Sequence, residues 1–251
     1  MKKKIFIFFG SIVFLLTVVL IYWFYFSKPN PFPTEEQLVK EMNSLFPEVS
    51  ASIIQEVIYL DKEHAFVPFI SEEDHYGISF WVWKHHKWMV EFMDTNGNMR
   101  VWKINNNDPS TYHFVWNSAS SEQLNYMNLY LIKKRNYYVT DNVHHYFPGV
   151  QMEEKISLPK TTYGSLPISN EWVSVIDSLN KLNSAKQPDP FFPFYTPQQD
   201  IYFGWNTIDK SDEITYPDRN LNSSTSWNGD SNIEYLLFIN DYSELEYPYQ
   251  K

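Results

Sequence analysis

The chain has 251 residues, a formal net charge of −10 at pH 7 and no cysteine. The acidic balance argues against nucleic acid as a partner, because phosphate backbones are bound by surfaces rich in lysine and arginine. Without cysteine there is no disulfide framework, no thiolate metal ligand and no cysteine nucleophile.

The first feature along the chain is the apolar segment Ile5–Phe26, which predicts a transmembrane helix. Its 22 residues include no charge and no proline. As a helix they span roughly 33 Å, enough to cross a hydrocarbon core of about 30 Å. The segment lacks the polar stripe of a buried globular helix. It ends in an interfacial aromatic cluster with no small-residue cleavage site, which favours an uncleaved anchor over a signal peptide.

Flanking lysines predict how this helix is oriented. Lys2, Lys3 and Lys4 precede it, whereas Lys28 alone follows closely, so residues 1–4 are predicted to be cytoplasmic and the rest extracytoplasmic. Beyond the helix, 30 acidic residues face 17 basic ones, a formal charge of −13. We therefore predict a single-pass cell-membrane protein whose lipid contact is Ile5–Phe26. Its lysine-rich, arginine-poor composition is typical of proteins from AT-rich bacterial genomes.

A spacer and a short helix are predicted next. Residues 27–33 hold three prolines, and proline fixes φ and keeps its preceding residue extended. Thr34 with Gln37 forms a capping-box pattern, and apolar residues then follow at helical spacing. The sequence predicts a helix over 35–45, which ends before Pro47.

Period-two alternation then takes over and predicts a β-meander. In Ile78–Trp83 both sets of alternating residues are apolar, so the sheet should be covered on both faces, one of them by the helix at 35–45. Asn96-Gly97 and Asn228-Gly229 each predict a hairpin. The predicted strands are Ile53–Leu60, Ala65–Ile70, Ile78–Trp83, Trp88–Met93, Met99–Ile104, Tyr112–Trp116, Met127–Ile132, Asn136–Thr140, Tyr202–Ile208 and Ile233–Ile239.

A second helix is predicted at 171–182, where apolar residues recur on one face. The fold class is therefore α+β and strand-rich, with a helix packed on a curved antiparallel meander. We expect one unit over 34–140 and a less regular, β-rich part over 141–251. Such a fold alone carries no function.

Four short clusters could carry chemistry. His85-His86 and His144-His145 could ligate a metal, but adjacent residues on an extended chain point in opposite directions. Asp94–Asn98 is rich in oxygen but lacks the terminal glutamate of a calcium loop. Glu153-Glu154 has the same defect as the histidine pairs, since neighbouring carboxylates on a strand cannot flank one glycosidic bond. We predict no catalytic, cofactor-binding or metal-ligating residue from these patterns.

Aromatic residues make up 18% of the chain. They can fill a β core or supply exposed platforms for sugars and proteins. The segment Gln187–Pro197 is both proline-rich and aromatic, and it must pack on its own domain or on another protein. It predicts a partner-docking surface, whose residues are Phe191, Phe192, Phe194 and Tyr195.

These patterns favour a membrane-anchored, non-enzymatic module that binds a protein partner or ligand at the cell envelope. The alternative is a cell-envelope hydrolase or carbohydrate-binding protein that acts on wall polymer. A purely structural envelope protein is the third alternative. A deep pocket with convergent carboxylates or histidines would favour the enzyme, whereas a shallow aromatic surface would favour binding.

Overall fold

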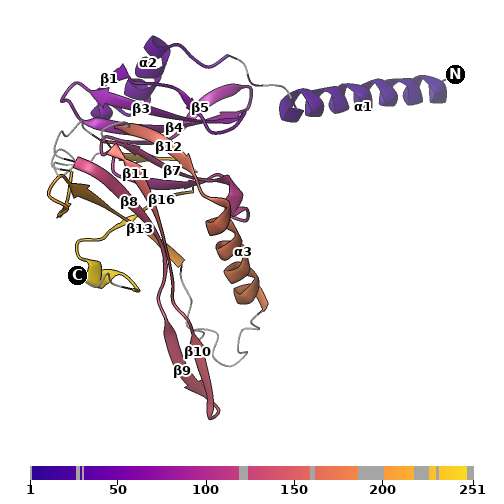
Figure 1. The fold of residues 1–251 in the computed structure, drawn as a ribbon. Helices are drawn as coiled ribbons and strands as arrows, with labels where there is room; N and C mark the ends of the chain where they lie inside the picture. The colour runs from indigo at the N-terminus through magenta and orange to yellow at the C-terminus, as the bar shows by residue number, and fades with distance from the viewer. Residues whose placement is uncertain are drawn as a thin grey trace.

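The computed structural model of the protein describes residues 2–26, 29, 31–118, 124–158, 162–185, 201–217, 226–229 and 232–247. Within these ranges the chain forms three α-helices and four β-sheets (Figure 1). The prediction of a strand-rich α+β fold is confirmed.

The two helices predicted beyond the apolar segment are both present. Helix α2 covers Glu35–Leu45 and begins with a complete capping box, in which the Thr34 and Gln37 side chains each accept a hydrogen bond from the other residue's backbone. Helix α3 covers Asn170–Ala185, somewhat longer than the predicted 171–182. Satisfying the first free N–H groups of α2 fixes where that helix starts.

Helix α1 covers Lys2–Phe26 and contains the predicted span. It extends away from the sheets (Figure 1). Every residue from Gly10 to Tyr22 is exposed. No helix in the described ranges meets the length and apolarity that a membrane crossing requires. The membrane anchor therefore stays a prediction.

Sheet A has six strands in the order β1-β3-β4-β5-β15, with β2 beside β3. The predicted meander corresponds to β3, β4 and β5, which pair in succession. The strand bounds are β1 Ala51–Ile54, β2 Ile58–Tyr59, β3 His64–Ser71, β4 Tyr76–Lys84, β5 Lys87–Asp94 and β15 Ser226–Asn228.

Sheets B and C follow the same antiparallel plan, except that β17 runs parallel to β13. Sheet B has the order β12-β7-β6-β16, and sheet C has the order β11-β8-β13-β14 with β17 beside β13. Their bounds are β6 Arg100–Lys103, β7 Tyr112–Asn117, β8 Leu124–Lys133, β11 Val150–Ser157, β12 Tyr163–Pro167, β13 Ile201–Asp209, β14 Ile214–Thr215, β16 Ile233–Tyr235 and β17 Leu237–Phe238. Each of the sheets A, B and C combines strands that come before residue 140 in the sequence with strands that come after it.

Four apolar clusters hold these layers together. Leu38 and Met42 of α2 pack on one face of sheet A. Phe80 of β4 points to the other face, where it packs against sheet B. A third cluster joins sheets B and C with α3, and a fourth places Ile239 and Leu245 on the outer face of sheet C. The prediction that sheet A is covered on both faces, one by helix 35–45, is confirmed.

Both predicted Asn-Gly hairpins are wrong. Strand β5 belongs to sheet A and β6 to sheet B, so the chain changes sheets at Asn96-Gly97. The same holds at Asn228-Gly229, between β15 and β16. Close backbone approach explains the glycine: a Cβ on Gly97 would lie 1.9 Å from the carbonyl oxygen of Asn117. Local turn propensity is overridden because the next strand finds its partner in another layer.

Five of the described strands have no counterpart in the sequence prediction: β10, β11, β12, β14 and β15. Strand β10 covers Val143–Phe147 and pairs with β9, Asn136–Thr140, as a two-stranded ribbon. Strand β11 forms the edge of sheet C. Strands β10 and β11 mix histidine or charged residues with apolar ones, so they lack the clean alternation of a half-buried strand.

Candidate functional site

A groove of about 720 Å³ lies between helix α2 and the β4–β5 hairpin. One wall is the extended segment that leads into α2 together with the helix itself, and the other is the hairpin. The lining residues are Pro31, Phe32, Pro33, Thr34, Gln37, Lys40, Glu41, Ser44, Trp83, His86, Lys87 and Trp88. We call this the α2 groove.

Aromatic rings form the apolar part of the α2 groove. Phe32 meets Trp88 edge to face, with 4.7 Å between the ring centroids, and Trp88 meets Trp83 at 5.8 Å. Trp83 is 8% exposed and Trp88 is 5% exposed. The two indoles are therefore held by packing, and only a small part of each is exposed to a ligand. Fixed aromatic rings of this kind favour apolar contact at little cost in side-chain entropy.

The polar wall comes from one stripe of α2. Gln37, Lys40, Glu41 and Ser44 follow the i, i+3, i+4, i+7 spacing, which places them on one helix face over about 10 Å. Burial raises the pKa of the Glu41 carboxyl, and the nearby Lys87 ammonium opposes this shift. The groove therefore joins an apolar floor to two lysines and one carboxylate.

The hairpin wall has an unusual turn. His85 and His86 have φ angles of 52° and 64°, in the left-handed region at the two central positions between β4 and β5. Asn-Gly or Asp-Gly normally occupies such a turn, because a side chain is strained there. Residues held in this conformation cost on the order of 1–3 kcal/mol each and often mark binding sites. His86 lines the α2 groove.

The pairs His144-His145 and Glu153-Glu154 lie on strands β10 and β11. His144 lies beside Tyr137 and His145 stacks on Tyr138, on opposite faces of the ribbon. Glu153 and Glu154 occupy successive positions of edge strand β11, as an edge-strand interpretation expects. No group of three or more histidine or acidic side chains suited to a metal occurs within the described ranges.

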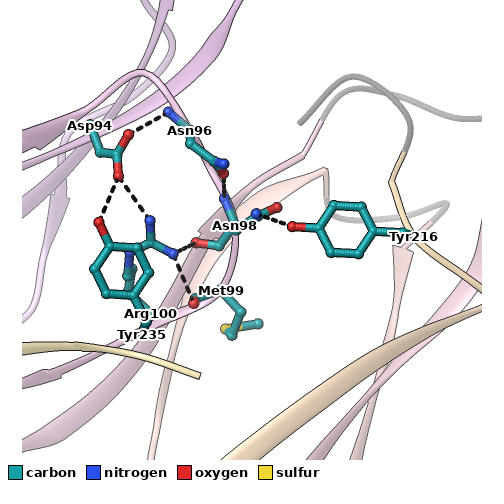
Figure 2. A network of polar contacts seen from close by, with 7 residues as sticks. All are labelled: Asp94, Asn96, Asn98, Met99, Arg100, Tyr216 and Tyr235. Atoms are coloured by element: carbon teal, nitrogen blue, oxygen red, sulfur yellow. Dashed lines mark hydrogen bonds and ion pairs between the residues drawn. The ribbon is translucent and has the colours of Figure 1, made fainter. Parts of the chain in front are cut away.

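A buried polar network stabilises the crossing from β5 to β6 (Figure 2). The Arg100 guanidinium donates to the Asp94 carboxylate at 2.8 Å, and both side chains are almost fully buried. The backbone N–H of Asn96 and the Tyr235 hydroxyl also donate to the Asp94 carboxylate, at 2.8 and 3.4 Å. Arg100 lies 3.6 Å over the Tyr235 ring. Neighbouring residues hold both Arg100 and Asp94 in place, so we assign this network a structural role and not a role in binding.

The predicted docking residues Phe191, Phe192, Phe194 and Tyr195 lie outside the described residues. The structure brings together a different set, which sequence reasoning missed. Phe32, Lys40 and Lys87 come from a spacer, a helix and the start of a strand, and each in isolation is typical of a solvated surface. The strained His85-His86 turn was the one local signal.

Comparison with known proteins provides no relative for this chain. No protein-family model, no curated protein and no solved structure matches it. Its function must therefore be argued from the groove and from the sequence.

Proposed function

We propose that this protein is a membrane-anchored, extracytoplasmic module that binds a protein partner or ligand at the cell envelope through the α2 groove. One observation carries the proposal: the groove is open and aromatic, and among the described residues that line it Glu41 is the one carboxylate and His86 the one histidine. Polysaccharide hydrolysis usually needs two facing carboxylates. A binding site needs apolar area and a few polar groups.

The anchor part of the proposal is supported by helix α1. Its side chains between Gly10 and Tyr22 are exposed, and most of them are large and apolar. An apolar helix exposed on all sides suits a lipid environment better than water. The exposed stretch from Gly10 to Tyr22 is shorter than a membrane span. The length of the proposed span is therefore that of the apolar sequence Ile5–Phe26, roughly 33 Å as a helix.

The α2 groove lies close to the end of this helix along the chain. Pro31, which lines the groove, is five positions after Phe26, and such a connection reaches at most about 18 Å. A ligand in the groove would therefore lie near the bilayer surface if α1 spans it. This position favours a partner that is itself at the membrane.

The topology has a direct test. A reporter that is active only outside the cytoplasm, fused after Lys251, is expected to be active, and the full-length chain should remain in the membrane fraction. Deleting Lys2, Lys3 and Lys4 should reduce correct insertion, because these charges set orientation. Recovery from the medium of a mature form that begins near residue 27 would contradict the anchor.

The groove is tested by filling it. Ser44→Trp places an indole on the exposed polar wall, and cross-linking of the full chain to membrane-fraction proteins should fall about tenfold, which corresponds to about 1.4 kcal/mol. Ser178→Trp is the matched control, since Ser178 lies on an exposed face of α3, and it should leave cross-linking unchanged. Equal cross-linking by both variants would exclude the groove as the contact.

Two further arms of this experiment separate the alternatives. We propose Phe191, Phe192, Phe194 and Tyr195 as a second contact with the same partner, on the basis of their proline-stiffened sequence. Replacing all four with serine should reduce cross-linking and leave the melting temperature within a few degrees, whereas unfolding would make them ordinary core. Release of soluble fragments from wall polymer by the unmodified protein would favour the hydrolase instead.

A further inference from the structure

The α2 groove carries an excess of positive charge in a protein that is otherwise acidic. Among the described residues that line it, Lys40 and Lys87 stand against the single carboxylate of Glu41, with histidine counted as neutral. The chain beyond Phe26 has a formal charge of −13. A local excess of the opposite sign favours ligands of complementary charge. The lining of the groove therefore points to an anionic ligand.

Both lysines are accessible to such a ligand. Lys40 is exposed on α2, and Lys87 is exposed at the start of β5. In the described part of the chain, no carboxylate lies within ion-pair distance of either ammonium group. By contrast, Lys84 on the preceding strand pairs with Glu91 at 2.7 Å. A ligand carboxylate could therefore bind Lys40 and Lys87 without first breaking an ion pair between described residues.

An aromatic rim lies beside these charges. The half-buried ring of Phe32 meets Tyr59 edge to face, with 5.7 Å between the ring centroids. Tyr59 also meets Trp88, at 6.2 Å. Because Tyr59 is 55% exposed, it extends the aromatic surface from the groove toward solvent. An apolar side chain of a ligand can pack on Phe32 and Tyr59, which offer large rigid faces.

The length of the polar wall favours a peptide over a lipid headgroup. The wall runs along α2 from Gln37 to Ser44, about 10 Å as a helix. An extended chain covers this length with about three residues, because it rises about 3.3 Å per residue. Its successive side chains point to opposite sides, so acidic and apolar residues in alternation would face different walls. A single phosphate headgroup would contact only part of the polar wall.

We propose that the α2 groove binds an extended, acidic segment of a membrane-protein partner, in which aspartate or glutamate alternates with apolar residues. The carboxylates lie against Lys40 and Lys87, and the apolar side chains pack on Phe32 and Tyr59. Glu41 weakens this binding, because like charges repel. The inference rests on the function proposed above for the groove, and it adds the charge and composition of the partner segment.

Peptide binding to the full-length chain in neutral detergent micelles tests the charge of the ligand. The probe is a dye-labelled peptide with blocked ends that alternates aspartate with leucine, and fluorescence anisotropy follows its binding. Two comparison peptides carry asparagine or lysine in place of aspartate. We expect the aspartate peptide to bind about fivefold more tightly than the asparagine peptide, and the lysine peptide to bind most weakly. Ser44→Trp, which fills the groove, should weaken the aspartate peptide about tenfold.

Charge variants of the protein should change binding in opposite directions. Lys40→Gln and Lys87→Gln should each weaken the aspartate peptide about two- to fivefold, the effect of an exposed ion pair. Glu41→Gln should tighten it by a similar factor, a gain that unfolding cannot produce. The matched controls are Lys210→Gln, in the exposed turn after β13, and Glu36→Gln, at an exposed position of α2 outside the groove lining. Both should bind within about twofold of the unmodified chain, because salt screens distant charges.

Three results would overturn the proposal. If the asparagine or lysine peptide binds as tightly as the aspartate peptide, and Ser44→Trp blocks it, the groove binds ligands without selecting acidic ones. If a photoactivatable phosphatidylglycerol labels residues 83–88 and the aspartate peptide does not displace it, the groove belongs to a lipid headgroup. If the aspartate peptide does not bind, the acidic segment is excluded. The function proposed for the groove fails as well only if Ser44→Trp also leaves cross-linking to membrane-fraction proteins unchanged.

Discussion

Arg100→Met is expected to destabilise the protein by about 3–5 kcal/mol, because it leaves the buried Asp94 carboxylate without its cation. Arg100 and Asp94 are 2% and 0% exposed and lie at the ends of β6 and β5. For a domain of this size the loss corresponds to a drop in melting temperature of roughly 6–20 °C. Thermal unfolding followed by circular dichroism measures it.

The pH dependence of this variant gives a sharper check. Burial raises the pKa of the Asp94 carboxyl above its usual value of 3.8, and Arg100 opposes the shift. A carboxyl with a raised folded-state pKa contributes stability that is present below its unfolded pKa and is lost as pH rises through the folded pKa. Removing Arg100 raises that pKa further. The deficit of Arg100→Met should therefore be larger at about pH 7.5 than at about pH 4.5.

Two controls separate the buried charge from ordinary packing. Arg100→Met combined with Asp94→Leu removes both charges and should recover much of the lost stability. Lys103→Gln breaks a pair with Glu234, whose side chain is 55% exposed, and should cost no more than about 1 kcal/mol. A neutral result for Arg100→Met at pH 7.5, or an equal deficit at both pH values, would contradict this account.

Trp81→Ala should reduce the free energy of unfolding by about 3–5 kcal/mol, out of a total of about 5–15 kcal/mol. Trp81 of β4 is fully buried on the face of sheet A that α2 covers. Its indole N–H donates to the Ser79 hydroxyl at 3.0 Å, and that hydroxyl donates to the Val67 carbonyl at 2.8 Å. Alanine leaves a cavity and removes this donor.

The same reasoning applies to three other buried tryptophans. Chemical denaturation measures the free energy of unfolding of all four alanine variants. Replacement by alanine should cost a similar amount at each of Trp83, Trp88 and Trp102. Trp81→Phe keeps most of the packing and should cost less than Trp81→Ala. Leu182→Ala is the exposed control and should change stability by no more than about 0.5 kcal/mol. Two of the four tryptophans replaced without loss of stability would mean that sheet A is not covered as described.

Several elements could be predicted because their causes are local. The capping box of Thr34 and Gln37 sets the start of α2, and the apolar residues at both alternating sets of positions in Ile78–Trp83 identify both covered faces of β4. In each case residues within a few positions of one another determine the backbone geometry. The apolar segment Ile5–Phe26 predicts its helix for the same reason.

The α2 groove and the layer crossings depended on tertiary structure. Asn96-Gly97 has a strong hairpin pattern, yet β6 pairs with β7 and not with β5, because its apolar residues are buried between sheets B and C and against sheet A. Phe32 and Lys87 meet in the groove although more than fifty residues separate them in the sequence. The sequence by itself determined local backbone geometry and the apolar faces of single elements. Which faces and edges meet was decided by long-range packing, whose energy depends on all the layers at once.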